Sequence, residues 1–183
     1  MQEKILFKGN FIQFVKRGNW EYAKRHNCQG IVIIVAQTDD KKILFVEQYR
    51  PPVGKKVVEF PAGLVGDNHE SANAGKTKKK ERLQTAAKRE LLEETGYRAG
   101  RMKVLMKGPV SGGFTSDIVT MVQAFDLVKV HEGGGVEDEE IIIHEIPFKG
   151  VYPWLKRMEQ KGRLIEPKIY SGLYFLHEYN NDL

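Results

Sequence analysis

The sequence predicts an α+β domain built around a mixed β-sheet. Three observations support this prediction: strand-like apolar runs fill much of residues 1–60, one strongly helical pattern covers 81–96, and further strand patterns precede two helical segments near the end. Strands and helices do not alternate regularly, as they would in a parallel α/β fold. With 183 residues, of which 41% are hydrophobic, the chain is long enough to bury a core.

The first part of the chain contains several strand patterns separated by turn residues. Residues 1–28 alternate apolar and charged side chains, which indicates short antiparallel strands with a turn near Gly18-Asn19. The run GIVIIVAQ at 30–37 is almost continuously apolar and β-branched, as in a strand that is buried on both faces. The next strands are expected at KKILFVEQYR (41–50) and KVVEF (56–60), the second followed by the turn Pro61-Ala62-Gly63.

The second part of the chain begins with a loop and a helix. Residues 66–80, GDNHESANAGKTKKK, lack apolar periodicity and are rich in Gly, Asn and Lys, so we expect a loop. From Glu81 apolar residues recur at helical spacing, and Gly96 stands where a left-handed helix cap belongs. The later elements are expected as strands at 102–107, 118–128 and 141–146, and as helices at Trp154–Gln160 and Ser171–Asn180.

Composition excludes several function classes. The longest purely apolar run, Ile31–Ala36, is far shorter than the roughly 20 residues of a membrane span, and the first residues show no signal-peptide pattern. Cys28 is the single cysteine, so an internal disulfide and a cysteine zinc site are excluded, and a reducing cytoplasm is expected. The net charge of +5 falls to +1 without the lysines at 76 and 78–80, so this tract is interpreted as a solvated loop and no nucleic-acid partner is expected.

The stretch RELLEETGY at 89–97 carries the strongest chemical signal. On a helix, Glu90, Glu93 and Glu94 lie at positions i, i+3 and i+4 and therefore share one face. Three carboxylates repel one another in water, and a hard cation such as Mg²⁺, which prefers oxygen ligands, relieves that repulsion. Arg89 is placed to neutralise or orient one of them. The alternative is a solvent-exposed charged face on which Lys88 and Arg89 are the partners.

This stretch resembles the signature of the Nudix hydrolase family. The signature is Gly, five residues, Glu, seven residues, Arg-Glu, an aliphatic residue, any residue, Glu-Glu, any residue, Gly and an apolar residue, and the chain matches it from Glu81 to Tyr97. Gly75 completes the pattern literally. We prefer Gly63 as the functional equivalent, because a rigid Pro-Ala-Gly turn can present the Ala62 carbonyl to a metal, whereas a loop rich in Gly and Lys cannot. Gly75 then belongs to an insertion at about 66–80.

The resemblance implies a fold, a domain division and a metal site. It implies an α/β/α sandwich with a mixed sheet over 29–183, preceded by a small antiparallel β unit over 1–28 that serves dimerisation and substrate recognition. It implies Mg²⁺, or Mn²⁺ as the alternative, held by Glu90 and Glu94, by Glu93 directly or through water, and by the Ala62 carbonyl. Arg89 and Glu93 are counted with the catalytic residues, Arg89 as the group that orients a carboxylate, and Glu81 closes the start of the helix.

Two further segments resemble the ADP-ribose and nucleoside-diphosphate-sugar pyrophosphatases of this family: VEQYRPPVGKKVVEFPAGLV (46–65) and NWEYAKR (19–25). The likeness implies a homodimer in which Trp20 stacks on a nucleobase across the subunit interface, Glu21 contacts base or ribose, and Arg25 and Arg50 contact diphosphate or ribose. The alternatives are a packing role for Trp20 and surface ion pairs for the two arginines.

The acidic loop EGGGVEDEEIII at 132–143 resembles the loop that carries the catalytic base in this subgroup. Glu140, immediately before the strand, matches best; Glu137 and Glu139 are the alternatives, and each also fits a solvated hairpin loop. The glycines are expected to let the loop move. SGGFTSD at 111–117 has Gly112 where ADP-ribose-preferring members have proline, which favours a hexose nucleotide such as GDP-mannose, or a broad range. His69, His131 and His144 do not have metal-ligand spacing.

The implied activity is Mg²⁺-dependent hydrolysis of the pyrophosphate bond of nucleoside diphosphate sugars, such as ADP-ribose or GDP-mannose, to nucleoside monophosphate and sugar phosphate. One alternative is a Nudix hydrolase for another diphosphate, a dinucleotide or an RNA cap, against which Trp20-Glu21 and Arg50-Pro51-Pro52 argue. Another is a non-catalytic domain that senses nucleotide sugars, against which the intact carboxylates argue. A fourth interpretation, a basic RNA-binding module, is supported by the lysine tract alone.

Overall fold

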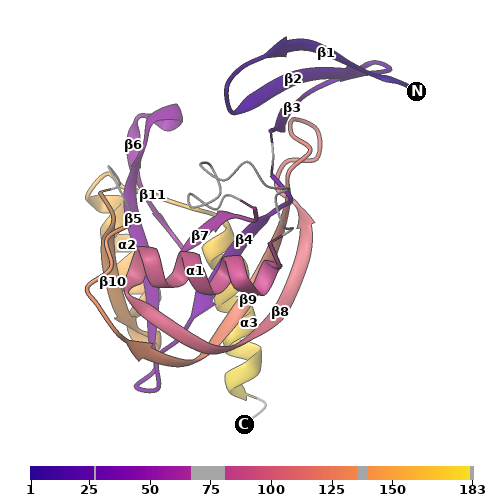
Figure 1. Cartoon of the computed structure of the whole chain (residues 1–183). Helices are drawn as coiled ribbons and strands as arrows, with labels where there is room; N and C mark the ends of the chain where they lie inside the picture. The colour runs from indigo at the N-terminus through magenta and orange to yellow at the C-terminus, as the bar shows by residue number, and fades with distance from the viewer. Residues whose placement is uncertain (27, 67–80, 136–139, 182–183) are drawn as a thin grey trace.

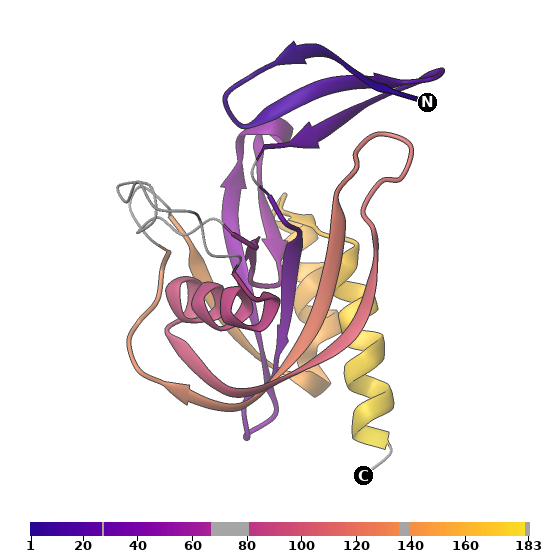
Figure 2. The same cartoon turned by 45° about the vertical axis from the view of Figure 1, so that its right-hand side comes forward.

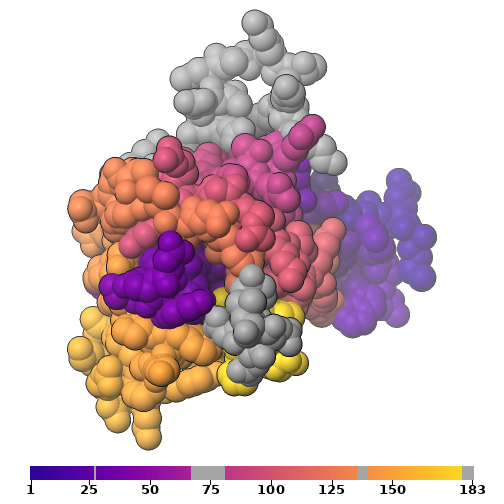
Figure 3. Space-filling view, turned by 90° about the horizontal axis from the view of Figure 1, so that it is seen from below, coloured from indigo at the N-terminus to yellow at the C-terminus, as the bar shows by residue number. Residues whose placement is uncertain are grey.

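The N-terminal strands form a sheet of their own. The computed structural model describes residues 1–26, 28–66, 81–135 and 140–181. Strands β1 (Glu3–Lys8), β2 (Ile12–Arg17) and β3 (Trp20–Arg25) pair antiparallel in sequence order, with the predicted turn at Gly18-Asn19 between β2 and β3. Figure 1 places this sheet above the rest of the chain, and the view from below in Figure 3 shows its residues projecting beyond the main body.

The main body contains two four-stranded sheets. The first has the order β7 (Ala62–Leu64), β4 (Ile31–Ala36), β9 (Ile118–Lys129) and β8 (Tyr97–Pro109); β4 and β9 run parallel and the other pairs antiparallel. The second has the order β10 (Ile142–Pro147), β5 (Lys42–Arg50), β6 (Lys55–Glu59) and β11 (Leu164–Ile165), with β11 parallel to β6. These pairings confirm the prediction of a mixed-sheet α+β fold.

Helices cover both faces of the strands. Helix α1 (Leu83–Thr95) lies on one side, and α2 (Val151–Gln160) and α3 (Lys168–Asn181) lie on the other, as Figures 1 and 2 show. Short 3₁₀ turns occupy Pro51–Val53 and Phe148–Gly150. Within the described residues, no helix is both long enough and apolar enough to cross a membrane.

Strand β4 explains why the chain has two apolar cores. Its side chains alternate: Ile33 and Val35 pack in the core beneath α2 and α3, whereas Val32, Ile34 and Ala36 pack in the core beneath α1. Because helices cover both faces of this strand, none of its side chains points into solvent. The run IVIIVA is therefore continuously apolar. The burial of this strand on both faces was predicted from the sequence.

The helices begin and end close to the predicted residues. Gly96 caps α1 in the left-handed conformation (φ 74°) and donates its N–H to the Leu92 carbonyl, as predicted. Helices α2 and α3 each begin three residues before the predicted start, at Val151 and Lys168. Pro153 lies in the first turn of α2 and Pro167 directly before α3, positions where proline is tolerated because the first helical N–H groups lack intrahelical partners.

A buried carboxylate joins the second sheet to the segment that follows α2. Glu47 on β5 accepts hydrogen bonds from His144 on β10 and from Arg163, both at 3.0 Å. Burial is the largest influence on the pKa of Glu47 and raises it, but the bonds from His144 and Arg163 outweigh burial and lower the pKa overall. The ionised carboxylate therefore stabilises the folded chain.

The Glu47 cluster gives a pH prediction. Because the folded-state pKa is lowered, the stabilisation is complete above the unfolded-state pKa of about 4.3 and is lost as the pH falls through the folded-state pKa. Glu47→Gln should lower the free energy of unfolding at pH 7 by about 2–4 kcal/mol, and the difference from wild type should shrink below about pH 4. Urea denaturation at pH 7 and about pH 3.5 measures this, and an equal difference at both pH values would contradict it.

Candidate active site

Helix α1 presents the predicted carboxylate face, and Arg89 binds two of its members. The Arg89 guanidinium contacts Glu90 through Nη2 at 2.9 Å and Glu93 through Nη1 at 3.0 Å. Only 13% of the Glu90 side chain and 6% of residue Glu94 are exposed to solvent. The face is thus partly buried, which argues against the alternative of an ordinary solvent-exposed surface.

Arg89 is also fixed from outside the helix. Its Nε donates to Glu81 at 3.3 Å, and its Nη2 donates to the Leu64 carbonyl at 3.3 Å. Burial opposes the charge of Arg89, but Glu90, Glu81 and Glu93 together raise its pKa above the ordinary value. Glu81 accepts a further hydrogen bond from the Gly66 N–H at 2.8 Å, so it ties the segment before residue 67 to the start of α1, in keeping with its predicted role.

Strand β7 lies directly against the carboxylates. The Ala62 N–H donates to Glu94 Oε2 at 3.1 Å. A Cβ atom on Gly63 would lie 1.9 Å from the Glu90 carboxyl carbon, so no side chain fits at this position. This close approach favours Gly63 over Gly75 as the glycine of the signature; Gly75 lies outside the described residues. Ala62 thus contacts the carboxylate face through its N–H. The role of its carbonyl as a metal ligand stays a prediction.

These surroundings fit a hard divalent cation. Glu90, Glu93 and Glu94 offer carboxylate oxygens beside a backbone wall from which side chains are excluded, and Mg²⁺ prefers such ligands. Among the described residues, no three His, Cys, Asp or Glu side chains converge as a ready-made metal cage. In this structure the Arg89 guanidinium holds the carboxylates of Glu90 and Glu93. A cation would take Glu90, Glu93 and Glu94 as ligands if the side chains of Glu90 and Glu93 turned away from Arg89.

The carboxylates open into a cleft of about 590 Å³. Arg25 and Arg50 line it together with Ala62, Arg89 and the three glutamates, so the structure brings most of the predicted site residues together. Ten charged side chains of the described residues line the cleft: Arg25, Arg50, Arg89, Lys168, Glu59, Glu90, Glu93, Glu94, Asp117 and Glu166. Four are cationic and six anionic, so the net charge is −2. The net charge of the cleft therefore does not by itself favour an anionic ligand.

Each predicted phosphate-binding arginine has an acidic partner that the sequence did not indicate. Arg25 Nε donates to Asp117 at 3.1 Å, and Arg50 contacts Glu59 Oε2 through Nε at 2.8 Å and Nη2 at 2.7 Å. Asp117 follows β8 by eight residues and Glu59 ends β6, so both pairings depend on tertiary structure. The ion-pair alternative for these arginines is therefore observed, at positions that also line the cleft.

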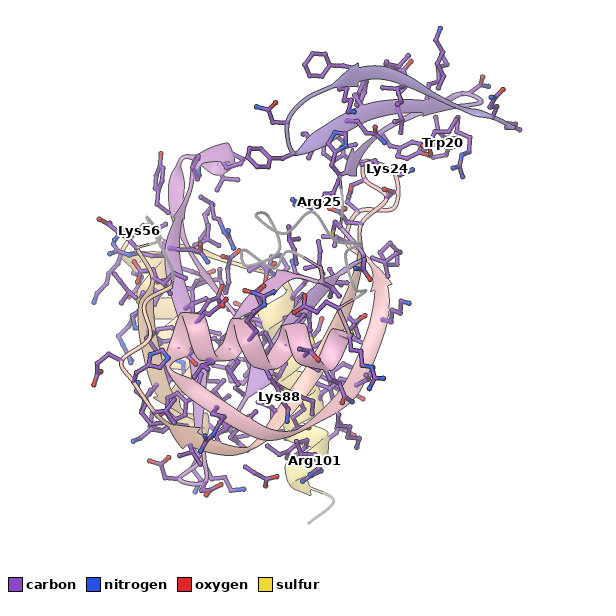
Figure 4. All side chains as sticks on the ribbon, in the orientation of Figure 1. Trp20, Lys24, Arg25, Lys56, Lys88 and Arg101 are labelled. Atoms are coloured by element: carbon purple, nitrogen blue, oxygen red, sulfur yellow. The ribbon has the colours of Figure 1, made fainter. Side chains whose placement is uncertain are left out.

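Trp20 and Glu21 lie outside this cleft. Trp20, which is 64% exposed, lines a second cavity of about 340 Å³ between the N-terminal sheet and the loop with Gly112 and Gly113. Glu21 pairs with Lys16 at 3.3 Å on the exposed surface of that sheet. Figure 4 shows Trp20 on the N-terminal sheet and Arg25 closer to the main body. Within one chain, the predicted base-binding residues and the carboxylates are therefore separate.

The glycines of the acidic loop anchor it to the carboxylate helix. Gly134 and Gly135 donate their N–H groups to the carbonyls of Glu94 and Glu93, at 2.9 and 3.1 Å. Gly133 has φ 74°, and a Cβ there would lie 2.4 Å from the Thr95 backbone, so only glycine fits. Gly134 and Gly135 satisfy carbonyls in the last turn of α1, and their positive φ angles of 110° and 88° favour glycine. The structure therefore gives these glycines an anchoring role, and the expectation that they let the loop move stays a prediction.

The predicted base lies beyond this anchor. Glu140 is exposed, is separated from β10 by Ile141, and is not among the residues that line the cleft. Glu137 and Glu139 lie outside the described residues. Of the histidines, His144 pairs with Glu47 and His131 Nδ1 accepts the Gly133 N–H, while His69 is also outside the described residues. The assignment of the base stays a prediction.

Comparison with known proteins identifies relatives of the whole central region. Residues 26–149 match the model of the NUDIX domain family. The chain is 33% identical over 143 residues to a methanol dehydrogenase activator of Bacillus methanolicus, covering 75% of this chain and 71% of that protein. It is 31% identical over 134 residues to an ADP-ribose pyrophosphatase of Bacillus subtilis (strain 168), covering 72% and 66%. A GDP-mannose pyrophosphatase of Escherichia coli (strain K12) is 27% identical over 138 residues, covering 71% and 65%.

A solved structure supports the fold. The crystal structure of an ADP compounds hydrolase superimposes with a TM-score of 0.69 and 19% identity, covering 100% of this chain and 93% of the other. The matched regions span about two thirds of the length of the three relatives above. The carboxylate face of α1 and the obligatory Gly63 beside it lie within the matched residues. The chain belongs to the Nudix hydrolase family.

Proposed function

We propose that this protein hydrolyses the pyrophosphate bond of nucleoside diphosphate sugars with Mg²⁺, giving a nucleoside monophosphate and a sugar phosphate. The observation that carries the proposal is the shared cleft, in which the carboxylates of α1 lie together with Arg25 and Arg50. The relatives that are named as pyrophosphatases of ADP-ribose and of GDP-mannose support this substrate class.

The chemistry follows from the charges of the cleft. When bound, Mg²⁺ supplies positive charge to the phosphoryl oxygens and makes a bound water more acidic. The planar guanidinium groups of Arg25 and Arg50 then offer paired hydrogen bonds to phosphoryl oxygens. Arg89, held by Glu81 and the Leu64 carbonyl, orients Glu90 and Glu93. The net charge of −2 supports a requirement for the cation, which would offset the negative charge that a diphosphate brings to the cleft.

Glu140 remains our proposed general base. The loop that precedes it is tied to the C-terminal turn of α1 through Gly134 and Gly135, so its first part keeps a fixed position relative to Glu93 and Glu94. A base carried by this loop would approach the cleft from the end of the carboxylate helix. The water-activating role of Glu140 therefore requires its carboxylate to lie closer to the cleft in the substrate complex than it does in the free protein.

We further propose that the protein is a homodimer. The N-terminal sheet exposes large apolar side chains, among them Phe7 (68%) and Phe11 (82%), together with Ile5 and Ile12. Such a patch is typical of a surface that a partner covers. A second copy of the chain would bury this patch and would bring its Trp20 toward the cleft of the first. The separation of Trp20 from the carboxylates within one chain agrees with that arrangement.

Trp20→Ala tests the stacking role. Loss of one base–aromatic contact, worth roughly 1–3 kcal/mol, should raise the KM for every nucleotide substrate about tenfold or more, while kcat changes little. Steady-state kinetics with substrates that carry two different nucleobases measures this. The matched control is Tyr152→Ala, which removes an exposed aromatic side chain from α2. A selective loss of kcat would contradict stacking.

The direct test of the proposed activity is a substrate panel. ADP-ribose, GDP-mannose, other nucleotide sugars and a dinucleoside diphosphate are incubated with Mg²⁺, and the products are identified by mass spectrometry. We expect cleavage between the two phosphates of at least one nucleotide sugar, with the Gly112–Gly113 loop favouring a hexose. Cleavage of the dinucleotide alone supports the alternative substrate class, and no cleavage of any compound contradicts hydrolysis.

A further inference from the structure

Lys168 is a cation of the cleft that the sequence did not indicate. It is the first residue of α3 and lines the cleft beside Arg50 and Glu59. Its side chain is 29% exposed, and its ammonium forms an ion pair with Glu166. An ordinary surface lysine on a helix extends into solvent, whereas this one is largely covered and faces charged groups.

The backbone around Lys168 is fixed by the second sheet. Strand β11 pairs parallel with β6 through Leu164 opposite Val57 and Ile165 opposite Val58. The next residue, Glu166, donates its N–H to the Val58 carbonyl at 3.0 Å. One residue after Lys168, Ile169 is fully buried in the core beneath α2 and α3. The side chain of Lys168 therefore extends from a fixed backbone next to β6, the strand that carries Glu59, which is the carboxylate paired with Arg50.

Among the described residues, the Lys168 ammonium has one acidic side chain in direct contact, that of Glu166. Burial, the largest influence, lowers the pKa of Lys168; Glu59 raises it and Arg50 lowers it. Glu59 already accepts two contacts from Arg50, so Glu166 is the acidic side chain in direct contact with the ammonium. A lysine is a single charge on a flexible stem and can move between acceptors, unlike a guanidinium held at two points.

We propose that Lys168 is a further substrate-binding residue, whose ammonium exchanges Glu166 for a phosphoryl oxygen of the bound diphosphate. This inference rests on the proposed function. It follows from the balance of charge: the cleft carries −2 with Lys168 present and would carry −3 without it, so each cation matters to a ligand that is itself anionic. Glu166 holds the ammonium in the free protein and competes with the substrate for it.

The test measures binding separately from turnover. A methylene-bridged analogue of the nucleotide sugar that the protein cleaves, which cannot be hydrolysed, is titrated by calorimetry in the presence of Mg²⁺. Lys168→Ala and Lys168→Gln should each weaken binding about tenfold, the scale of one charge-assisted hydrogen bond, and raise KM similarly with a smaller change in kcat. Lys168→Arg should restore part of the affinity. Lys156→Ala, on the exposed face of α2, is the matched control and should leave binding unchanged.

Glu166→Gln separates a binding role from a structural one. It removes the competing carboxylate, so the analogue should bind as tightly as to wild type or a few-fold more tightly. If Glu166→Gln weakens binding as much as Lys168→Ala, or if both Lys168 variants keep wild-type affinity and KM, the inference is wrong. If the wild-type protein neither cleaves nucleotide sugars nor binds their analogues, the proposed function itself fails and the role of Lys168 with it.

Discussion

Glu94→Gln and Glu90→Gln are each expected to reduce turnover of a nucleotide sugar by at least about a thousandfold while leaving the fold intact. A Gln side chain has the shape of Glu and can still accept the Ala62 N–H bond at position 94, but it lacks the charge that a hard cation needs. Removing one carboxylate also relieves repulsion on the crowded face of α1. Steady-state kinetics at saturating Mg²⁺ measures the loss, and thermal unfolding checks the fold.

The matched control for these variants is Glu159→Gln, which changes an exposed glutamate on α2 that does not line the cleft. It should keep wild-type turnover and stability. Two results would contradict the metal assignment: wild-type turnover in Glu94→Gln, or a loss of activity that is matched by loss of the folded state. The second would assign Glu90 and Glu94 to the stability of the chain instead of to its chemistry.

Gly63→Ala is expected to have the next largest effect. The new Cβ would lie 1.9 Å from the Glu90 carboxyl carbon and 2.0 Å from its Oε1, so either β7 or the Glu90 side chain must move. A misplacement of about 1 Å at a catalytic group can cost on the order of a hundredfold in rate, and we expect at least that loss in kcat. The atoms that the new Cβ meets belong to a carboxylate that lines the cleft and not to the apolar core. The free energy of unfolding should therefore fall by only about 1–3 kcal/mol.

Gly108→Ala provides the comparison for Gly63→Ala. Gly108 also lies on a strand of the first sheet, but a Cβ there meets nothing within 4 Å. This variant should keep wild-type kcat and stability. Equal activity of the two alanine variants would show that close contact between β7 and Glu90 is not needed for catalysis, and it would remove the physical reason for choosing Gly63 as the signature glycine.

Much of the fold could be predicted because local pattern and tertiary environment agree. The continuous apolar run of β4 follows from its burial on both faces, and the cap at Gly96 follows from a conformation that glycine adopts readily. The face formed by Glu90, Glu93 and Glu94 follows from helical spacing alone. Each of these features depends on residues that are close together in the chain.

The remaining features depend on contacts between distant segments. Glu59 and Asp117 hold the two arginines, and Lys168 reaches the cleft only because β11 pairs with β6; a strand of two residues leaves no periodic signal. The glycines of the acidic loop were interpreted as a source of mobility because glycine permits many conformations. Their anchoring role became evident only when Gly134 was placed against the end of α1.

Binding of the metal ion tests the central claim most directly. Mn²⁺ can replace Mg²⁺ at carboxylate sites, and its electron paramagnetic resonance signal reports how much of it is bound. In the presence of the methylene-bridged analogue, wild-type protein should bind Mn²⁺, Mg²⁺ should displace it, and Glu94→Gln should bind it at least tenfold more weakly. Equal binding of Mn²⁺ by wild type and Glu94→Gln would contradict the claim that the carboxylate face of α1 holds the metal.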